Sequence, residues 1–256
     1  FPPFLLMGLR FTFAASILIW WFPIPRGFLK KIFIVSLIAN TLQYGITYTG
    51  LSMIDASAAV LLVQMEVIFG VVFAYFMLKE KPTTRSLIGI SIAFIGVYIL
   101  TGSPSLNGKF IGAALTVTGA GIWALGQVLV KPLSKEINPL ALVAWLALFS
   151  GPILITLSAI FDGNTINYFK TASLDSWIIA IYLGFIMQPI SYGCFYYVLK
   201  NNPLYKVLPI VTMGIPLTGL LAAIFILGEE PTRELFIGGA IILLGVVMIV
   251  FGNKKN

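Results

Sequence analysis

The feature of this sequence that most constrains its fold is an internal repeat in strongly apolar surroundings. The segment Leu78–Thr83, with the sequence LKEKPT, returns as Leu227–Thr232, with the sequence LGEEPT. An Ile-Gly pair and a Gly-Val pair follow each copy at the same spacing, so that all matched positions are 149 apart. A supersecondary unit that occurs twice is typical of folds whose two related halves share one core. The repeat therefore predicts a protein built from two similar halves.

The composition places both halves in a lipid bilayer. Hydrophobic residues make up 59% of the 256 residues and charged residues only 10%, whereas about a quarter of an ordinary soluble domain is charged. So little polar surface cannot cover a particle in water, which leaves lipid as the surrounding solvent. The chain has no histidine and one cysteine, Cys194. These counts exclude an internal disulfide, a Cys/His metal cluster and a histidine-based catalytic triad, so we expect no metal and no cofactor.

Nine apolar segments each approach the length of about 20 residues that a helix needs to cross a bilayer. They predict an all-α, polytopic membrane bundle. The expected spans run over residues 3–22, 32–53, 56–78, 86–101, 110–130, 139–161, 177–199, 205–227 and 235–252.

The positive charges are sorted by loop, which predicts the orientation. Alternate loops and the C-terminus hold twelve Lys and Arg residues, and the other loops hold three, Lys109, Lys170 and Arg233. Cytoplasmic loops of membrane proteins carry the excess of Lys and Arg. We therefore expect the C-terminus in the cytoplasm, and we interpret the net charge of +7 as a topology signal and not as a nucleic-acid surface.

Further matches extend the repeat over most of the chain. Pro3 matches Pro139, and Tyr44 matches Tyr192, while the span that contains Trp123 has no earlier counterpart. The simplest hypothesis is that one more helix precedes Phe1, which gives ten helices in two five-helix repeats. We therefore expect a first repeat over 1–101 that lacks its first helix, and a second over 110–252. An odd number of helices in each repeat would insert the second repeat upside down relative to the first, with the binding site near the midplane.

These residues resemble the drug/metabolite transporter superfamily, and its EamA-type branch in particular. The resembling segments are Pro2-Pro3 through Gly8–Phe11, the Leu-x-Glu-x-Pro-Thr segment of each half, and Trp123-Ala124. The resemblance implies ten helices in two inverted halves, a location in the bacterial inner membrane and the movement of small metabolites, often as export. Within the family, the arrangement is most similar to exporters of amino acids and cysteine-pathway metabolites.

The sequence departs from that family at one pair of positions. Members often carry Glu-Pro near the middle of two matching helices, whereas here Glu66 precedes Val67 and Ile215 precedes Pro216. Each half keeps one residue of the pair, which makes a symmetric pair of acids unsuitable as the basis of a mechanism.

Two charged side chains, Arg10 and Glu66, fall well inside the expected spans. An ionisable residue at membrane depth is costly and marks a functional site by default. Both are expected roughly 12–15 Å from the outer face at 1.5 Å per residue, so they could share one cavity, where Arg10 would bind a substrate carboxylate and Glu66 an ammonium group or a coupled proton. The alternatives are a structural ion pair, and an Arg10 side chain that extends to the lipid interface.

A second group of candidates is polar and aromatic. Asn40, Gln43, Tyr44 and Thr47 follow helical spacing, and Tyr48 extends the stripe. A polar stripe on an apolar helix must face protein or a water-filled cavity. The matching helix and the span around Trp123 add further candidates. The alternative role for all of them is hydrogen bonding between helices. The residues added are Trp123, Gln127, Gln188, Ser191, Tyr192 and Tyr196.

Prolines and glycines suggest hinges and close packing. Pro189, Pro209 and Pro216 each remove a backbone hydrogen bond within a span and are candidate gating positions, with a static kink as the alternative. Two matching helices carry small residues on one face, which predicts close helix packing. Glu80 and Glu229, at matched helix ends, are expected to be helix caps or to organise the adjoining loops. The small residues are Gly89, Ala93, Gly96, Gly238 and Gly245.

The sequence thus predicts a carrier for a small-molecule metabolite, with proton coupling through Glu66 as an option. One alternative is a membrane-embedded sensor or scaffold without transport, although the chain has no soluble domain or long loop that would serve such a role. A membrane-embedded enzyme would need a cluster of nucleophile, base or metal ligands at one depth, and the sequence offers a single deep acid.

Overall fold

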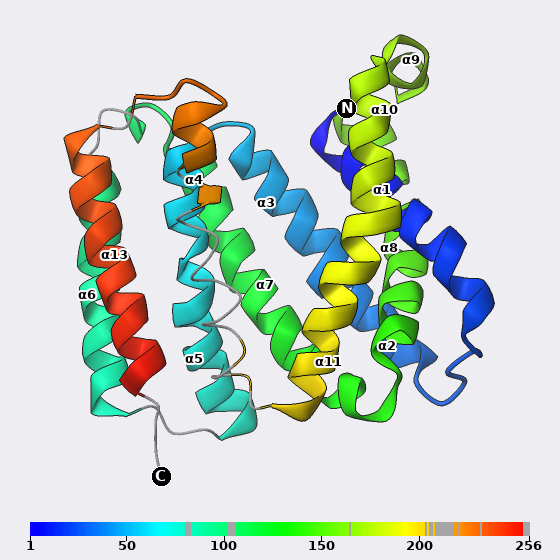
Figure 1. Ribbon diagram of the computed structural model, residues 1–256, viewed down its shortest axis with the longest axis horizontal. Coiled ribbons are helices and arrows are strands. Elements are labelled where there is room, and N and C mark those ends of the chain that lie inside the picture. The colour runs from blue at the N-terminus through cyan, green and yellow to red at the C-terminus, as the bar shows by residue number, and fades with distance from the viewer. Residues whose placement is uncertain are drawn as a thin grey trace. The chain divides into compact units, whose positions relative to one another are not determined.

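A computed structural model describes residues 1–79, 83–101, 106–163, 165–202, 204, 207, 218–219, 221–230 and 232–252. Throughout these residues the regular secondary structure is helical (Figure 1), which confirms the all-α prediction. Among the described residues, five helices are long and apolar enough to cross a membrane: Pro3–Trp21, Ala56–Met77, Phe110–Glu136, Pro139–Phe161 and Leu174–Asn201. The expected span 205–227, with Pro209 and Pro216, lies largely outside the described residues, as does Glu80.

The chain divides into two compact units that do not coincide with the sequence repeats. Unit 1 joins residues 1–48 to 129–202, and unit 2 joins 49–128 to 203–256. Each unit therefore takes helices from both repeats. Unit 1 contains α1 (Pro3–Leu18), η1 (Ile19–Trp21), α2 (Leu29–Ser36), η2 (Leu37–Leu42), most of α3 (Gln43–Leu51), α8 (Pro139–Phe161), α9 (Thr165–Thr171), α10 (Leu174–Ile181), η4 (Tyr182–Tyr192) and α11 (Gly193–Asn201).

The described helices of unit 2 are fewer and longer. They are α4 (Ala56–Val63), α5 (Met65–Leu78), α6 (Thr84–Thr101), most of α7 (Phe110–Glu136) and α13 (Arg233–Gly252).

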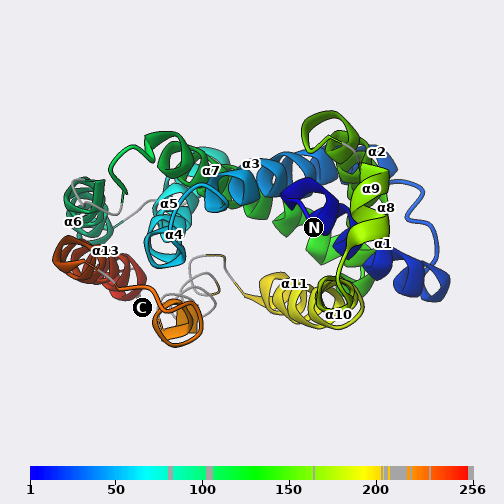
Figure 2. The ribbon, with the colours of Figure 1, turned by 90° about the horizontal axis from the view of Figure 1, so that it is seen from above.

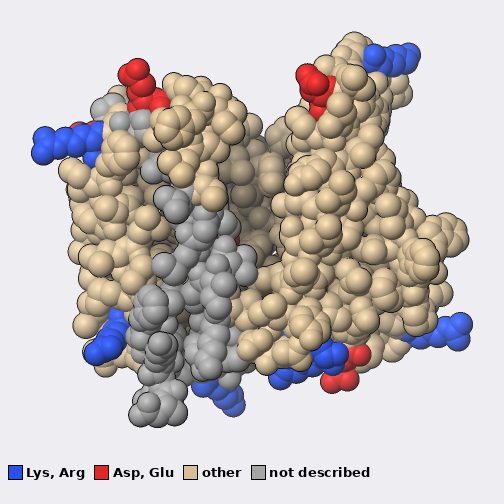
Figure 3. Space-filling view, in the orientation of Figure 1, with Lys and Arg blue, Asp and Glu red and all other residues tan. Residues whose placement is uncertain are grey.

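The outer surfaces of the helices suit a bilayer. Large apolar side chains such as Tyr98, Ile111 and Phe161 are more than two-thirds exposed, which would be costly in water and is favourable against lipid tails. On the face drawn in Figure 3, Lys, Arg, Asp and Glu gather near the helix ends of each unit, and the surface between is mostly uncharged. This distribution fits helices whose middle parts lie in hydrocarbon.

In unit 2, the matching helices α6 and α13 cross at their small residues and lie side by side (Figure 2). A Cβ added to Gly89 would lie 2.6 Å from the carbonyl oxygen of Gly245, and one added to Gly96 would lie 2.8 Å from that of Gly238. The first glycine of each helix therefore contacts the second glycine of the other. This reciprocal pattern requires the two helices to run antiparallel, as an inverted repeat demands, and it confirms the predicted small-residue packing.

Unit 1 shows the same inversion in α1 and α8. A Cβ on Gly8 would lie 2.6 Å from Ile155, and one on Gly151 would lie 2.6 Å from Thr12. Later positions on α1 thus meet earlier positions on α8, so these helices are also antiparallel.

One contact in unit 1 occurs twice, once in each repeat. A Cβ on Gly45 would meet the Phe4 ring at 2.6 Å, and one on Gly193 would meet Leu140 at 2.6 Å. Phe4 matches Leu140 by the spacing of Pro3 and Pro139, and Gly45 matches Gly193 by the spacing of Tyr44 and Tyr192. The repeat is therefore preserved at the level of single contacts.

The helix over residues 29–51 in the first repeat and its counterpart over 174–201 in the second widen into π-helix at matching places. The widened segments are η2, between α2 and α3, and η4, between α10 and α11. Pro189 lies inside η4 and contributes no backbone N–H to its hydrogen bonds. The helical spacing in the sequence predicted a regular helix in both places. π-Helical turns are uncommon and occur often at functional sites. The residues in and next to η2 and η4 are therefore candidates for a functional site.

Candidate functional site

Arg10 is the most unusual side chain of unit 1, because it carries a full charge in the interior of an apolar bundle. Its helix, α1, packs against both α8 and η4, and the side chain is 2% exposed. The guanidinium Nη2 lies 3.3 Å from the sulfur of Met187 and Nη1 lies 3.8 Å from the sulfur of Met7. A thioether is a weak acceptor, so these contacts fill space around the cation without neutralising it.

Three aromatic rings also lie beside the guanidinium. Its central carbon lies 5.2 Å from the ring centroid of Tyr44 and 5.8 Å from the centroids of Phe11 and Tyr192. Tyr48 also interacts with Arg10. A cation within about 6 Å of a ring face is attracted by the ring quadrupole, by about 2 kcal/mol when water is excluded. The rings therefore stabilise the buried charge in part.

The tyrosines of this cluster are arranged by the repeat. Tyr44 and Tyr192 occupy matching positions, and their hydroxyl groups hydrogen-bond to each other. Tyr48 packs on Tyr44 and Tyr196 packs on Tyr192, each with ring centroids 5.7 Å apart. This hydrogen bond therefore joins equivalent residues of the two repeats.

Arg10 breaks this symmetry. By the spacing of Pro3 and Pro139, its counterpart is Leu146. In the described part of the chain one ion pair is found, between Lys109 and Asp55, and Arg10 Nε has no hydrogen-bond partner there. A buried charge is normally paired with an opposite charge. The neighbours of this one among the described residues are neutral groups, so its charge is not balanced by them.

The other predicted polar residues of unit 1 are also buried. Asn40, Gln43 and Gln188 are no more than 5% exposed. The Gln43 side chain donates a hydrogen bond to Thr47 at 3.0 Å, while Gln188 Oε1 has no partner among the described residues. Ser191 differs, since it is exposed. It lies within η4, where the wider turn no longer keeps the helical spacing that placed Ser191 with Gln188.

Glu66 lies in unit 2, and the prediction that it shares a cavity with Arg10 stays a prediction. Its side chain is 5% exposed, and Oε1 finds no hydrogen-bond partner among the described residues. The helix is interrupted just before it, where Val67 N–H donates to Gln64 three residues back, at 3.1 Å. Gln64, two residues before Glu66, is also buried.

Helix α7 brings further polar groups into unit 2. Gln127 is 1% exposed, and its Oε1 has no partner within the described residues. Trp123, one turn earlier, is half-buried. These positions are compatible with the lining of a binding site, and that role stays a prediction for both residues.

Glu229 proves to be the helix cap that the sequence predicted. Its two carboxylate oxygens accept hydrogen bonds from the backbone N–H groups of Ala56 and Ser57, at 2.8 and 3.0 Å. These are the first N–H groups of α4, which have no partner within the helix. Partial burial alone would raise the pKa of Glu229, but the hydrogen bonds from Ser57 and Ala56 and the nearby charge of Lys109 together lower it.

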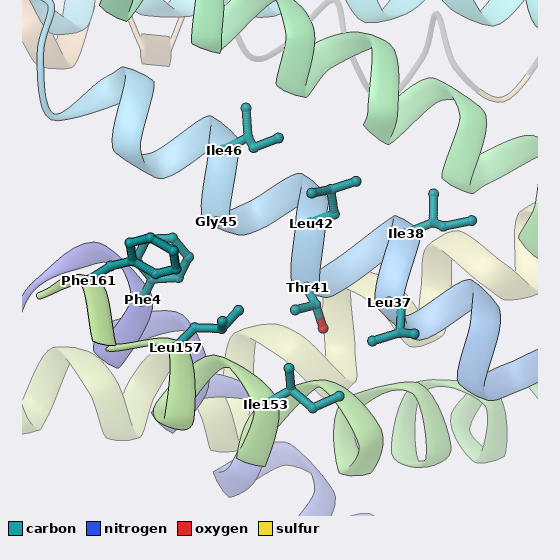
Figure 4. Close-up of a pocket in the computed structure, with 10 residues that line it drawn as sticks. All are labelled: Phe4, Leu37, Ile38, Thr41, Leu42, Gly45, Ile46, Ile153, Leu157 and Phe161. Atoms are coloured by element: carbon teal, nitrogen blue, oxygen red, sulfur yellow. The ribbon is translucent and has the colours of Figure 1, made fainter. Parts of the chain in front are cut away.

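A pocket in unit 1 was not anticipated from the sequence. It has a volume of about 560 Å³ and lies between the helix that contains η2 and the helix α8 (Figure 4). Its walls are apolar side chains such as Leu42, Ile153 and Phe161, together with the hydroxyl-bearing Thr41. That hydroxyl has no partner among the described residues. Apolar residues of a lipid-facing helix and of a pocket look alike in sequence, so no signal distinguished them.

Comparisons with known proteins agree with this architecture. A solved crystal structure matches 99% of this chain and 88% of its own, with a TM-score of 0.70 and 17% identity, which supports the fold. A "Probable amino-acid metabolite efflux pump" of Escherichia coli K12 is 28% identical over 99% of this chain and 87% of its own length. A protein of the same description from Salmonella typhimurium is 29% identical over the same shares.

The family comparison covers almost the whole chain. The model of the EamA-like transporter family matches residues 1–102 and 110–251. Together with the apolar spans, the antiparallel repeats and the buried charges, this match identifies a multi-pass membrane transporter. The chain belongs to the EamA-like transporter family.

Proposed function

We propose that this protein is a secondary transporter that exports amino acids or related small metabolites across the bacterial inner membrane. The substrate binds between the inverted repeats, and the repeats expose it alternately to the two sides. The similarity to the two amino-acid metabolite efflux pumps supports this substrate class and direction. The distribution of Lys and Arg between the loops supports a cytoplasmic C-terminus.

The observation that carries the proposal is the buried, unneutralised cation of unit 1. Arg10 is 2% exposed and faces tyrosine rings and methionine sulfur atoms. A fixed charge in this environment is costly for a membrane protein to retain. A substrate carboxylate would neutralise it, and a guanidinium suits that role because its planar donors match a carboxylate.

The remaining candidates have supporting roles in this proposal. Asn40, Gln43, Tyr48, Gln188 and Tyr196 line the site beside Arg10, Tyr44 and Tyr192. We also propose that Trp123, Gln127 and Glu66, in unit 2, bind substrate. Glu66 binds the substrate ammonium group or carries a coupled proton, and Pro189, Pro209 and Pro216 act as hinges.

A membrane-embedded sensor or scaffold is the competing function. It would bind the same ligands, so ligand binding by itself does not separate the two. Counterflow does, because it requires the bound substrate to cross the membrane. Catalysis is not part of the proposal, since the family match is to transporters.

The test is counterflow of labelled amino acids into proteoliposomes that contain the full-length protein. We expect uptake of one or more amino acids, and its loss in Arg10→Met, which keeps an unbranched side chain and removes the charge. Removing one partner of a buried charge pair costs about 2–5 kcal/mol. Arg26→Met is the matched control, because Arg26 is exposed in a loop. Unchanged counterflow in Arg10→Met would contradict the proposed site, and absence of counterflow with any amino acid would contradict the proposed substrate class.

A further inference from the structure

The hydrogen bond between Tyr44 and Tyr192 links the two repeats inside unit 1. Tyr44 lies at the start of α3 in the first repeat, and Tyr192 lies at the end of η4 in the second. Their hydroxyl groups bond to each other and both rings contact the Arg10 guanidinium. The link between the repeats therefore adjoins the group that attracts an anion.

The chemistry of the two phenols makes this bond exchangeable. A phenol has one O–H to donate, and in a bond between two phenols one hydroxyl donates while the other accepts. A carboxylate has two oxygens and accepts from several donors at once. Hydrogen bonds to a charged acceptor are roughly twice as strong as those between neutral groups. A carboxylate beside Arg10 would therefore compete successfully for both phenol hydrogens.

We propose that the Tyr44–Tyr192 bond is a latch between the repeats, and that the carboxylate of the substrate opens it. The carboxylate binds Arg10 and accepts a hydrogen bond from each phenol, so that the phenols no longer bond to each other. This inference rests on the proposed function and adds to it the chemical group that is recognised and the contact that it breaks.

The backbone on either side of the latch is suited to such a change. Tyr44 directly follows η2 and Gln43, and Tyr192 is the last residue of η4. A π-helical segment can return to ordinary helix by shifting its hydrogen-bond register, which rotates the residues that follow. We expect such a shift to let both phenols turn toward an anion without unfolding either helix.

The specificity that follows is for a carboxylate over an uncharged isostere. Arg10 has no carboxylate partner among the described residues of unit 1, so an anion gains an attraction that a neutral amide does not. Acetate and acetamide have nearly the same shape and differ in this charge. They are therefore suitable minimal probes for the latch, independent of which metabolite is transported.

The experiment measures access to a cysteine beside the latch. The full-length protein carries Cys194→Ser, which removes the exposed native cysteine, and Thr47→Cys, which introduces a reporter at a buried position one turn after Tyr44. The rate of labelling by a maleimide is measured in detergent. Acetate should raise the rate by about fivefold, the factor that corresponds to opening one neutral hydrogen bond, and acetamide should leave it unchanged.

Two phenylalanine variants remove the latch itself. Tyr44→Phe and Tyr192→Phe each delete one hydroxyl of the same bond, so each should label about fivefold faster without acetate, and the pair combined should label no faster than either. Tyr197→Phe is the matched control, because Tyr197 is on α11 and is 64% exposed. Size-exclusion profiles verify that the variants are folded.

The outcomes separate the latch from the proposed function. An acetate-insensitive reporter, or labelling of both folded phenylalanine variants at the parent rate, would overturn the latch. Counterflow that depends on Arg10 would survive either result. Equal responses to acetate and acetamide would overturn the role of the carboxylate.

Discussion

Unit 1 and unit 2 each bury a charged side chain within an apolar span, and they surround it differently. Arg10 of unit 1 has identified neighbours on several sides, namely aromatic rings and two sulfur atoms. Glu66 of unit 2 follows a break in its helix, and its Oε1 has no partner among the described residues. The Arg10 cation is thus enclosed by aromatic rings and sulfur atoms, while the Glu66 carboxylate lies next to a break in its helix.

The helices inside unit 1 and the helices inside unit 2 pack in the same way. In each, helices from different repeats cross antiparallel where glycine allows backbones to approach. The charges are exceptions to the repeat, since Leu146 matches Arg10 and Ile215 matches Glu66. The comparison suggests that the repeated glycines build the fold, while each buried charge adds a group that the matching position of the other repeat does not supply.

If the glycine crossings of the two units are equivalent, enlarging a glycine at either crossing should give the largest loss of stability. The loss should be similar in both units. Gly245→Leu in unit 2 and Gly8→Leu in unit 1 would place a side chain within 3 Å of neighbouring atoms, much of it backbone. Such overpacking costs about 1–3 kcal/mol and occasionally more, so we expect loss of about 3 kcal/mol or of folded protein altogether. Gly27→Ala is the control, because a Cβ there meets nothing within 4 Å. Fluorescence size-exclusion yield and thermal unfolding measure the effect, and a well-folded Gly245→Leu would show that the crossings differ.

The second prediction asks whether Glu66 is as important as Arg10. Glu66→Gln keeps the shape of the side chain and removes its charge and its capacity to release a proton. We expect counterflow to fall by about tenfold or more, equivalent to about 1.4 kcal/mol. The matched control is Glu136→Gln, at an exposed helix end. Unchanged transport with an unchanged pH profile would remove Glu66 from the mechanism and leave unit 1 with the functional charge.

Much of this architecture could be predicted from the sequence, because the bilayer imposes regular helices of known length. The repeat at Gly89 and Gly238, the cap at Glu229 and the burial of Arg10 all follow from local patterns. The partners of a side chain are harder to predict, since they depend on contacts between distant segments. Met187, for example, contacts Arg10, although a methionine in an apolar span looks the same in sequence whether it packs on a neighbour or faces lipid.

The π-helical segments and the division into units could not be predicted for related reasons. The stripe from Asn40 to Tyr48 was interpreted with a regular periodicity, but helix widening depends on packing with neighbouring helices, and apolar residues fit either geometry. The units combine segments from both repeats because antiparallel copies exchange helices across their interface. Sequence similarity groups residues by ancestry, whereas contacts group them by proximity.

The third prediction concerns the cap of unit 2, for which unit 1 uses a different device. The side-chain oxygen of Asn138 caps α8 at its own N-terminus by accepting hydrogen bonds from the backbone N–H groups of Leu140 and Ala141, whereas Glu229 caps α4 from a distant loop. Glu229→Gln should lower the free energy of unfolding at pH 7 by about 1 kcal/mol, allowing for solvent screening. Thermal unfolding in detergent measures the loss.

The pH dependence of that loss has a definite sign. The pKa of Glu229 in the folded protein is below its ordinary value of 4.5, so its charge stabilises the fold above that pH. The stabilisation declines as the pH falls below 4.5 and through the lowered pKa. The difference between Glu229→Gln and the parent should therefore be constant near neutral pH and shrink in acid. A difference that grew in acid would contradict the cap.

The smallest expected effect tests whether the apolar pocket of unit 1 is functionally separate from the cluster around Arg10. Thr41 is 6% exposed, and its hydroxyl has no partner among the described residues. Thr41→Val keeps the branched shape and removes the hydroxyl, so we expect a gain of stability of up to about 1 kcal/mol and unchanged counterflow. The matched variant is Thr12→Val, where the hydroxyl donates to the carbonyl oxygen of Gly8 at 2.8 Å and its removal should not stabilise the fold. A loss of counterflow in Thr41→Val alone would mean that the hydroxyl binds a ligand, and the pocket would then belong to the transport path.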